Sequence, residues 1–281
     1  MHRCIGLINF AKNENMINLK HFIIMVFITG CTGNYLTAQK RIVMVLSAAD
    51  TISLNQGEKQ RQTGVFLNEF YLAYHSIKQA GYQVNFATAA AKTPSIDKES
   101  TDDKYWKDKL ELKKQAIAFV ERDSAFLHPK SLEYVLDHHD QYIGLVIPGG
   151  QGLMVDLAQD KHIPRLLQQF AIEQKPTGLI CHAPSLLLSM AKQENPYIGY
   201  KVSAVSPMEE FVIERFIMNG KPASRKIGKR LRKYGFKYRS GLPKANFAIK
   251  DQNLVTSQNP FSSAAFSELY LEALSEYQAK N

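Results

Sequence analysis

The stretch TGLICHAPSLLLSMA, residues 177–191, holds the pattern that decides the fold. Its first four residues are typical of a short strand buried in a parallel sheet, and residues 184–191 are expected to form a helix. Cys181 and His182 stand at the junction between the two. In open α/β folds such junctions lie at the C-terminal edge of the sheet, where ligands bind. The stretch therefore predicts an α/β architecture with a site at Cys181.

Strands and helices alternate on both sides of this stretch, which predicts a mostly parallel central sheet with helices on both faces, in one domain over residues 41–281. Residues 92–141 are expected to form a polar insertion with helical pieces over one face. The further strands are expected at residues 42–46, 82–87, 142–147 and 202–205, with a late hairpin of 247–249 and 254–256. The further helices are expected at residues 62–80, 152–158, 163–174 and 224–234, and after Asn259-Pro260.

The composition indicates a globular protein, because 45% of the 281 residues are hydrophobic and 22% are charged. The formal net charge of +9 is local. It comes from residues 221–239, which hold nine Lys or Arg and no acid, so the remainder is about neutral. Ile227, Leu231 and Tyr234 can pack this basic segment on the sheet as a helix with a solvated basic face. We therefore expect no nucleic-acid partner.

The N-terminus resembles an export signal. Residues 16–30, MINLKHFIIMVFITG, have a positive start and an apolar run that is too short to span a membrane. The following Cys31 completes a sequence similar to a bacterial lipobox, whose Cys becomes lipidated; ordinary cleavage near Ala38 is the alternative. We therefore expect residues 1–40 to be an N-terminal extension with a signal or lipoprotein segment. The protein would then lie in the bacterial cell envelope, with possible attachment to the membrane through the lipid. A buried N-terminal helix in a cytoplasmic protein is the competing interpretation.

Cys181 is the one cysteine in the predicted domain, since Cys4 and Cys31 precede it, so no disulfide can form within the domain. An unpaired thiol in an exported protein is either buried and inert or retained for its reactivity. A helix N-terminus beside the sulfur would lower the pKa of the thiol, and His182 can act as acid or base. The sequence favours a nucleophile at Cys181 over a structural cysteine.

The loop PGGQG, residues 148–152, ends another predicted strand. Its glycines allow a sharp turn that leaves amide N–H groups facing a ligand, so Gly149, Gly150 and Gln151 are candidate oxyanion or substrate contacts. A plain strand-to-helix turn is the alternative. The loop lacks the Lys of a phosphate-binding loop. No metal and no cofactor are predicted, because adjacent histidines such as His138 and His139 do not share a face.

Five segments together resemble the ThiJ/PfpI group of the class I glutamine amidotransferase-like superfamily. Within that group the chain is most similar to the glyoxalase III and heat-shock chaperone subfamily. The segments are TGVFLNE at 63–69, PGGQG at 148–152, ICHAP at 180–184, KVSAVS at 201–206 with Glu209-Glu210 after it, and LVTSQNP at 254–260. The resemblance implies a flavodoxin-like three-layer sandwich and a homodimer.

The resemblance also implies a role for each matching residue. Cys181 would be the nucleophile, and Glu69 the carboxyl that contacts its sulfur and keeps its proton, because two anions in a dry pocket repel. His182 would be the acid/base, oriented by Glu210, with Glu209 as the neighbouring candidate. The amides of Gly150 and of His182 would bind the developing oxyanion.

The implied activity is a glutathione-independent lyase (hydro-lyase) reaction on a small carbonyl compound, in which the thiolate adds to methylglyoxal and water later releases lactate. Several residues depart from the glyoxalase pattern. Leu72 and Ala73 replace a His-Pro pair, Gln151 replaces a loop His, and Ala183 replaces a Gly. These positions are expected to border the pocket. The differences therefore leave the thiol chemistry in place but do not fix the identity of the substrate.

Two other functions fit the residues. The first is a hydrolase of amides or small peptides that uses Cys181, His182 and Glu210 and passes through an acyl-enzyme. The second is a holdase chaperone or stress-response protein without turnover, in which Cys181 becomes oxidised. Loss of aldehyde turnover in Cys181→Ala would favour the enzyme, and retained suppression of aggregation would favour the chaperone.

Overall fold

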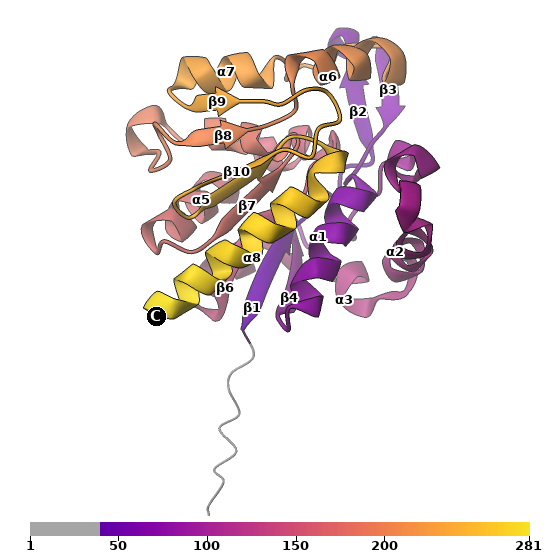
Figure 1. The fold of residues 1–281 in the computed structure, drawn as a ribbon. Helices are drawn as coiled ribbons and strands as arrows, with labels where there is room; N and C mark the ends of the chain where they lie inside the picture. The colour runs from indigo at the N-terminus through magenta and orange to yellow at the C-terminus, as the bar shows by residue number, and fades with distance from the viewer. Residues whose placement is uncertain (1–39) are drawn as a thin grey trace, which may run out of the picture. The chain divides into compact units, whose positions relative to one another are not determined.

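A computed structural model describes residues 40–281 of the chain, which fall within one compact unit (Figure 1). The predicted signal segment, the lipidation candidate Cys31 and Cys4 lie outside the described residues. None of the helices within residues 40–281 combines the length and the hydrophobicity that a membrane crossing needs.

A seven-stranded sheet forms the centre of the fold, with the order β10-β11-β7-β6-β1-β4-β5. All neighbouring pairs are parallel except the edge pair of β10 and β11, which is antiparallel. The mostly parallel sheet predicted from the sequence is therefore confirmed. Its strands are β1 Arg41–Val45, β4 Gln83–Thr88, β5 Lys130–Ser131, β6 Tyr142–Ile147, β7 Thr177–Ile180, β10 Ala248–Asp251 and β11 Leu254–Ser257.

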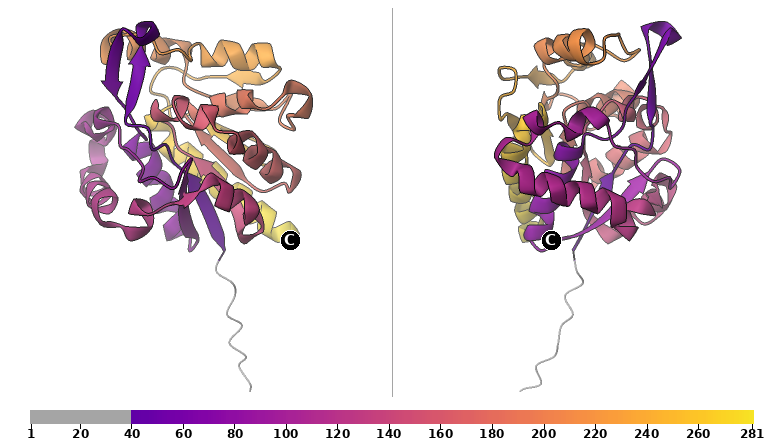
Figure 2. Two further views of the ribbon diagram at one scale, coloured as in Figure 1. Left: turned by 180° about the vertical axis from the view of Figure 1, so that it is seen from behind. Right: turned by 90° about the vertical axis from the view of Figure 1, so that its right-hand side faces the viewer.

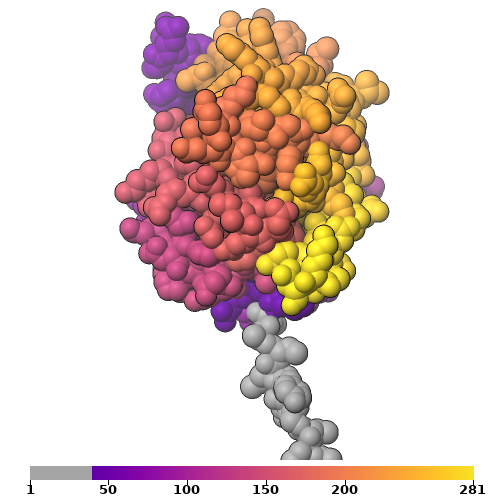
Figure 3. Space-filling view, turned by 90° about the vertical axis from the view of Figure 1, so that its left-hand side faces the viewer, coloured from indigo at the N-terminus to yellow at the C-terminus, as the bar shows by residue number. Residues whose placement is uncertain are grey.

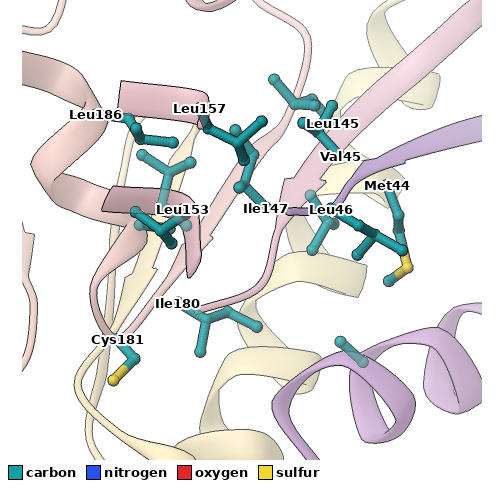
Figure 4. Close-up of a cluster of buried hydrophobic side chains, with 14 of the residues drawn as sticks. Met44, Val45, Leu46, Leu145, Ile147, Leu153, Leu157, Ile180, Cys181 and Leu186 are labelled. Carbon is teal, nitrogen blue, oxygen red and sulfur yellow. The ribbon is translucent and has the colours of Figure 1, made fainter. Parts of the chain in front are cut away.

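The central strands are mostly apolar because both faces of the sheet are covered. In β1, Ile42, Val43, Met44 and Val45 are all fully buried. Figure 4 shows part of this core, in which Leu145 and Ile147 of β6 meet Leu153 and Leu157 from the segment that follows. The core thus fixes the carboxyl ends of β6 and β7 relative to one another.

Helices cover both faces of the sheet, as expected for a three-layer sandwich (Figures 1 and 2). On one face α1 packs against α8 and against α2, and on the other face α4 packs against α5. A 3-10 helix, η8, packs against α5 as well. These elements are α1 Leu67–Gln79, α2 Leu110–Arg122, α4 Leu132–Asp137, α5 His162–Ile172, η8 Ala183–Ser189 and α8 Ser263–Lys280; the short α3 Ser124–Leu127 follows α2.

A further group of elements lies beyond the carboxyl ends of the parallel strands, at the top of Figure 1. Figure 3 shows residues of this group, in orange, covering the upper end of one side of the molecule. It comprises the hairpin of β2 Thr51–Leu54 and β3 Lys59–Gln62, the strand pair β8 Lys201–Ser203 and β9 Lys237–Arg239, the helices α6 Pro207–Val212 and α7 Ile227–Tyr234, and the π-helical turn η10 Ile213–Ile217. These elements cover the carboxyl edge of the sheet, where the sequence predicts the site.

The structure corrects several sequence expectations. The helix expected from residue 62 begins at Leu67, because the preceding residues pair as the β2–β3 hairpin. The helices expected at 152–158 and 184–191 are 3-10 turns. Residues 92–141 do not cover one face, since α2 packs on α1 whereas α4 packs on α5 on the other side. Strand β8 pairs with β9 and not with the main sheet.

Candidate functional site

Cys181 follows the last residue of β7 and turns the chain sharply into η8. Its backbone φ of 59° lies in the left-handed region, which non-glycine residues adopt only where neighbouring structure holds them. Here the Cys181 N–H donates to the carbonyl oxygen of Ser257 at 2.9 Å, and the Cys181 carbonyl oxygen accepts from Val205 N–H at 2.9 Å. Figure 4 shows the side chain at the border of the apolar cluster, after Ile180. The strained turn therefore presents the thiol at the carboxyl edge of the sheet.

His182 contacts both the thiol and the glycine-rich loop. Its Nδ1 lies 3.1 Å from Cys181 Sγ, and its Nε2 lies 2.9 Å from the side-chain amide of Gln151. Burial lowers the pKa of His182 from 6.5 to about 4, so the imidazole is neutral near pH 7. A neutral ring can accept the thiol proton at Nδ1 when its own proton is on Nε2.

Gln151 can hold His182 in that tautomer. Its Oε1 is buried and has no hydrogen-bond partner within residues 40–281 when the amide nitrogen faces the ring. The two ends of an amide have nearly the same shape, and the orientation with Oε1 toward His182 Nε2 gives this oxygen a donor. Gln151, predicted as a substrate contact, thus becomes the residue that orients the acid/base.

Glu69 lies in the first turn of α1, and its carboxyl interacts with the Cys181 side chain. Its Oε2 accepts from Gly149 N–H at 3.0 Å. Burial raises the pKa of Glu69 from 4.5 to about 8, against the smaller lowering effect of the contacts with Cys181 and Gly149. The carboxyl therefore keeps its proton near pH 7 and faces the sulfur as an acid.

Burial, followed by the nearby Glu69, raises the pKa of the Cys181 thiol well above its ordinary value. The sequence expectation of a lowered thiol pKa is therefore wrong for the resting site. It assumed a regular helix behind the sulfur, whereas η8 is a 3-10 helix of seven residues, and burial outweighs its effect. Burial therefore favours the protonated thiol in the resting site, and the neutral His182 Nδ1 lies within hydrogen-bonding distance of it.

Two candidate oxyanion amides remain, that of Gly150 in the glycine-rich loop and that of His182 after Cys181. The Gly149 N–H is committed to Glu69, which corrects its assignment as an oxyanion contact. The Gly150 and His182 amides donate to no carbonyl oxygen within residues 40–281, and the His182 N–H faces the Cys181 sulfur. Gly150 has a φ of 112°, and a Cβ there would lie 2.2 Å from the Gly64 carbonyl oxygen, so only glycine fits.

Glu210 does not orient His182. Both of its carboxylate oxygens accept from Ile227 N–H at 3.2 Å, and burial raises its pKa from 4.5 to about 6. This carboxylate caps the N-terminus of the basic helix α7, where Lys226 provides no side-chain cap. The assignment of Glu210 as the third member of a triad is therefore corrected, because a carboxylate turned toward α7 cannot hold the imidazole.

Glu209 borders the cavity but does not hydrogen-bond His182 either. Its Oε2 accepts from Ser206 N–H and Gln258 Nε2, and its Oε1 accepts from Lys244 N–H and Asn259 Nδ2, at 2.8–3.0 Å. Four donors fix this carboxylate between α6 and the loops before and after β10–β11. Within the described residues, its role is to join these segments around the site.

A cavity of about 160 Å³ opens above Cys181, His182, Gly150 and Gln151. Most of its remaining lining is apolar or aromatic, and comes from segments far apart in the chain: Phe66, Tyr105, Val205, Val212, Ile213, Ile217, Pro243, Pro260 and Phe261. Sequence reasoning missed these lining residues. Only Phe66, Val205 and Pro260 fall in recognisable segments; the others have no local signal. In the described part of the chain, no three His, Cys, Asp or Glu side chains converge to hold a metal ion.

Comparisons with known proteins agree with this geometry. A sequence profile of the DJ-1/PfpI family matches residues 62–273. The protein/nucleic acid deglycase HchA of Escherichia coli O139:H28 is 23% identical over 233 residues, which cover 82% of this chain and 80% of that protein. The glyoxalase III structure from Candida albicans has a TM-score of 0.68 at 19% identity, and the alignment covers 83% of this chain and 97% of that one. The rapid encystment protein of 24 kDa from Francisella tularensis has a TM-score of 0.68 at 22% identity, with 84% and 99% covered.

Proposed function

The chain belongs to the DJ-1/PfpI family, and from that premise we propose that it is a cysteine-dependent enzyme of reactive aldehydes that works as a glyoxalase III. The observation that carries the proposal is the convergence of two side chains, those of His182 and Glu69, on the sulfur atom of Cys181. A neutral imidazole lies 3.1 Å from Cys181 Sγ, and the protonated carboxyl of Glu69 faces the same sulfur. Two candidate oxyanion donors, the amides of Gly150 and His182, border the same space.

Attack on the aldehyde uses these groups in order. The thiol proton passes to His182 Nδ1 as Sγ forms a bond to the aldehyde carbon of a 2-oxoaldehyde. The electron pair of the C=O bond moves onto oxygen, where the amides of Gly150 and His182 stabilise it. Protonation of that oxygen gives a hemithioacetal. No external oxidant or reductant is consumed in this step.

Two further steps complete the cycle. The proton on the first carbon is removed, and a proton is delivered to the second carbon, so the aldehyde carbon is oxidised to a thioester while the ketone is reduced to an alcohol. Neutral His182 and protonated Glu69 are the base and the acid in contact with the sulfur that holds the substrate. Water then breaks the C–S bond, which releases a 2-hydroxy acid (lactate from methylglyoxal) and restores the thiol.

The test is turnover of methylglyoxal without glutathione, measured as lactate formed. We expect the full chain to produce lactate and Cys181→Ala to produce none above the buffer rate. The matched control is Cys4→Ala in the full-length chain, which makes the same change in the N-terminal extension, outside the domain that holds the site. Absence of both lactate from methylglyoxal and glycolate from glyoxal with the wild-type protein would overturn the proposal.

A hydrolase remains the second candidate, favoured by the name of the Escherichia coli relative, a deglycase. Here the aldehyde would arrive as an adduct on an amino group, or the substrate would be an amide. The same Cys181 and His182 would then form a thioester that water cleaves. Two results together would support the hydrolase over the lyase. An activated ester would add an acyl mass to Cys181, and methylglyoxal adducts would be released slowly while free aldehyde is not turned over.

A holdase function is favoured by one separate observation, the apolar side chains that α6 and η10 expose. Phe211 is 57% exposed, Phe216 71% and Met208 58%, with Leu242 at 80% on a loop. Exposed apolar surface of this kind can bind unfolded clients. We would assign this activity to the exposed surface and not to the thiol if Cys181→Ala still suppresses aggregation of client proteins. The double variant Phe211→Ser with Phe216→Ser should then have lost that suppression.

We also propose that the protein acts in the cell envelope, on the basis of the lipobox-like sequence at Cys31. Intact-mass analysis of the protein from native membrane and soluble fractions tests this. A diacylglyceryl mass on a chain that begins at Cys31 would support it. A full-length, unmodified chain in the cytoplasmic fraction would contradict it.

A further inference from the structure

The cavity above Cys181 offers more apolar contact than methylglyoxal can use. Methylglyoxal carries one methyl group beside its two carbonyls, and these carbonyls must lie at Cys181 and at the amide of Gly150. The apolar lining of the 160 Å³ space would then stay without a substrate group to cover it. Charged residues such as Arg61, Asp97 and Lys244 also border the cavity, but most of its lining is apolar. A largely apolar lining binds best the ligand that removes it from water.

One part of the lining is an aromatic wall formed by Phe66, Tyr105 and Phe261. The rings of Phe66 and Tyr105 meet edge to face at 4.9 Å, and those of Tyr105 and Phe261 lie 5.9 Å apart. The fully buried Asn68 ties their segments together, because its Nδ2 donates to Tyr105 O at 2.9 Å and to Pro260 O at 3.2 Å. The wall is therefore held in place before a substrate arrives.

The second part is aliphatic and comes from α6 and η10, which supply Val212, Ile213 and Ile217 to the cavity. Ile213 and Ile217 are half-buried, whereas their neighbour Phe216 is 71% exposed and does not line the cavity. The π-helical turn thus directs Ile217 into the cavity and the adjacent Phe216 into solvent. Substitutions at Ile217 and Phe216 can therefore separate an effect on substrate binding in the cavity from an effect on the structure of the turn.

We propose that the preferred substrates are 2-oxoaldehydes whose ketone carries a bulky apolar group, aryl or branched alkyl, and that methylglyoxal is a poor substrate by comparison. This inference rests on the proposed function and specifies its substrate class. The reaction balances as before: Cys181 Sγ adds to the aldehyde carbon, a proton moves between the two carbons, and water releases the thiol. Phenylglyoxal would give mandelate and 4-methyl-2-oxopentanal would give the isobutyl-substituted 2-hydroxy acid.

The experiment compares methylglyoxal, 4-methyl-2-oxopentanal and phenylglyoxal with the full chain, each measured as the 2-hydroxy acid formed. The readout is the product formed and not the aldehyde lost, because aldehydes also disappear by reacting with arginine side chains. We expect kcat/KM for the two larger aldehydes to exceed that for methylglyoxal by about tenfold or more, since several additional carbon atoms leave water. Equal or higher kcat/KM with methylglyoxal would overturn the inference and leave the proposed function intact.

Two variants assign the preference to the cavity. Ile217→Asn should lower kcat/KM for phenylglyoxal at least tenfold more than that for methylglyoxal, and a thermal melt close to that of the wild type shows that the variant is folded. Phe216→Asn, the same substitution at the preceding residue, should change kcat/KM for neither aldehyde. Equal losses with both aldehydes in Ile217→Asn would contradict a substrate contact at this position.

Binding of the products separates this inference from the proposed function. If no aldehyde is turned over, the proposed function fails, and calorimetry with mandelate and lactate then tests the pocket alone. Mandelate bound at least tenfold more tightly than lactate, with the difference lost in Ile217→Asn, supports the apolar pocket. Equal affinities for mandelate and lactate would overturn it.

Discussion

His182 Nδ1 lies 3.1 Å from Cys181 Sγ, within hydrogen-bonding distance of the thiol. The two residues are adjacent in sequence, and the left-handed backbone of Cys181 brings their side chains together. Because burial favours the neutral imidazole and the protonated thiol, the proposed mechanism has the proton pass from the thiol to His182 as the electrophile is attacked. The following predictions test the groups around this pair.

Replacing Glu69 by Gln should lower kcat by about 100-fold or more, because general acid/base groups typically contribute at least this much. Wild-type kcat/KM should fall as the pH rises through about 8, where Glu69 loses the proton that burial holds on it. The residual activity of Glu69→Gln should show no such inflection. Initial rates of 2-hydroxy acid formation between pH 5 and 10 measure both effects. An unchanged alkaline limb in the variant would remove Glu69 from the mechanism.

The same carboxyl should make stability depend on pH. The unfolded chain releases the Glu69 proton near pH 4.5, whereas the folded protein holds it to about pH 8. Its contribution is therefore complete below pH 4.5 and is lost as the pH rises to about 8, on the order of 4 kcal/mol in total. Urea denaturation at pH 5 and pH 8 should show a smaller loss of unfolding free energy in Glu69→Gln than in the wild type. Equal losses would contradict the buried, protonated carboxyl.

Gln151 should act by positioning His182 and not by binding substrate. Gln151→Met, which keeps the length of the side chain and removes the amide, should lower kcat about tenfold to 100-fold with little change in KM. Gln151→Glu places a carboxylate beside the imidazole, which stabilises its protonated form and raises the pKa of His182 above about 4. The acid limb of the pH–rate profile should then move to higher pH. A rise in KM alone would show a substrate contact instead.

Glu210 should matter for stability and not for turnover. Glu210→Gln replaces the carboxylate that caps α7, so the free energy of unfolding should fall by about 1 kcal/mol at pH 7. The kcat should stay within about twofold of the wild type. Thermal melting and steady-state rates measure the two effects, and Glu69→Gln serves as the same chemical change at a buried carboxyl inside the site. A loss of kcat above tenfold in Glu210→Gln would restore the triad hypothesis.

The sequence was sufficient to predict most strands of the sheet, but not its edge strand β5 or the elements that cover its carboxyl edge. Strands such as β1 and β6 are apolar on both faces, so their residues identify a buried parallel strand directly. The hairpin β2–β3 was missed because its residues are mostly polar and its strands pair only with each other. The strand β8 was found, but its pairing with β9 depends on residues 36 positions away in the chain.

The site was predictable where a motif is local. Cys181 and His182 stand at a strand end, and the segment around Glu69 carries a recognisable pattern, so all three were identified before the fold was known. Glu210 was misassigned because neighbouring carboxyls on α6 turn in different directions, and sequence spacing does not show which. Its true contact, Ile227 N–H, lies on another helix. The pKa of the thiol was misjudged because burial, which opposes ionisation, cannot be seen in a strand–helix pattern.

The most direct test is the intact mass of the protein during turnover of a 2-oxoaldehyde without glutathione. We predict that acid quenching within the first turnovers traps one aldehyde equivalent on Cys181, and that the trapped mass disappears as the 2-hydroxy acid accumulates. In Cys181→Ala both the adduct and the product should be absent. Product formation by Cys181→Ala at the wild-type rate, or turnover with no mass ever found on Cys181, would contradict nucleophilic attack by this thiol.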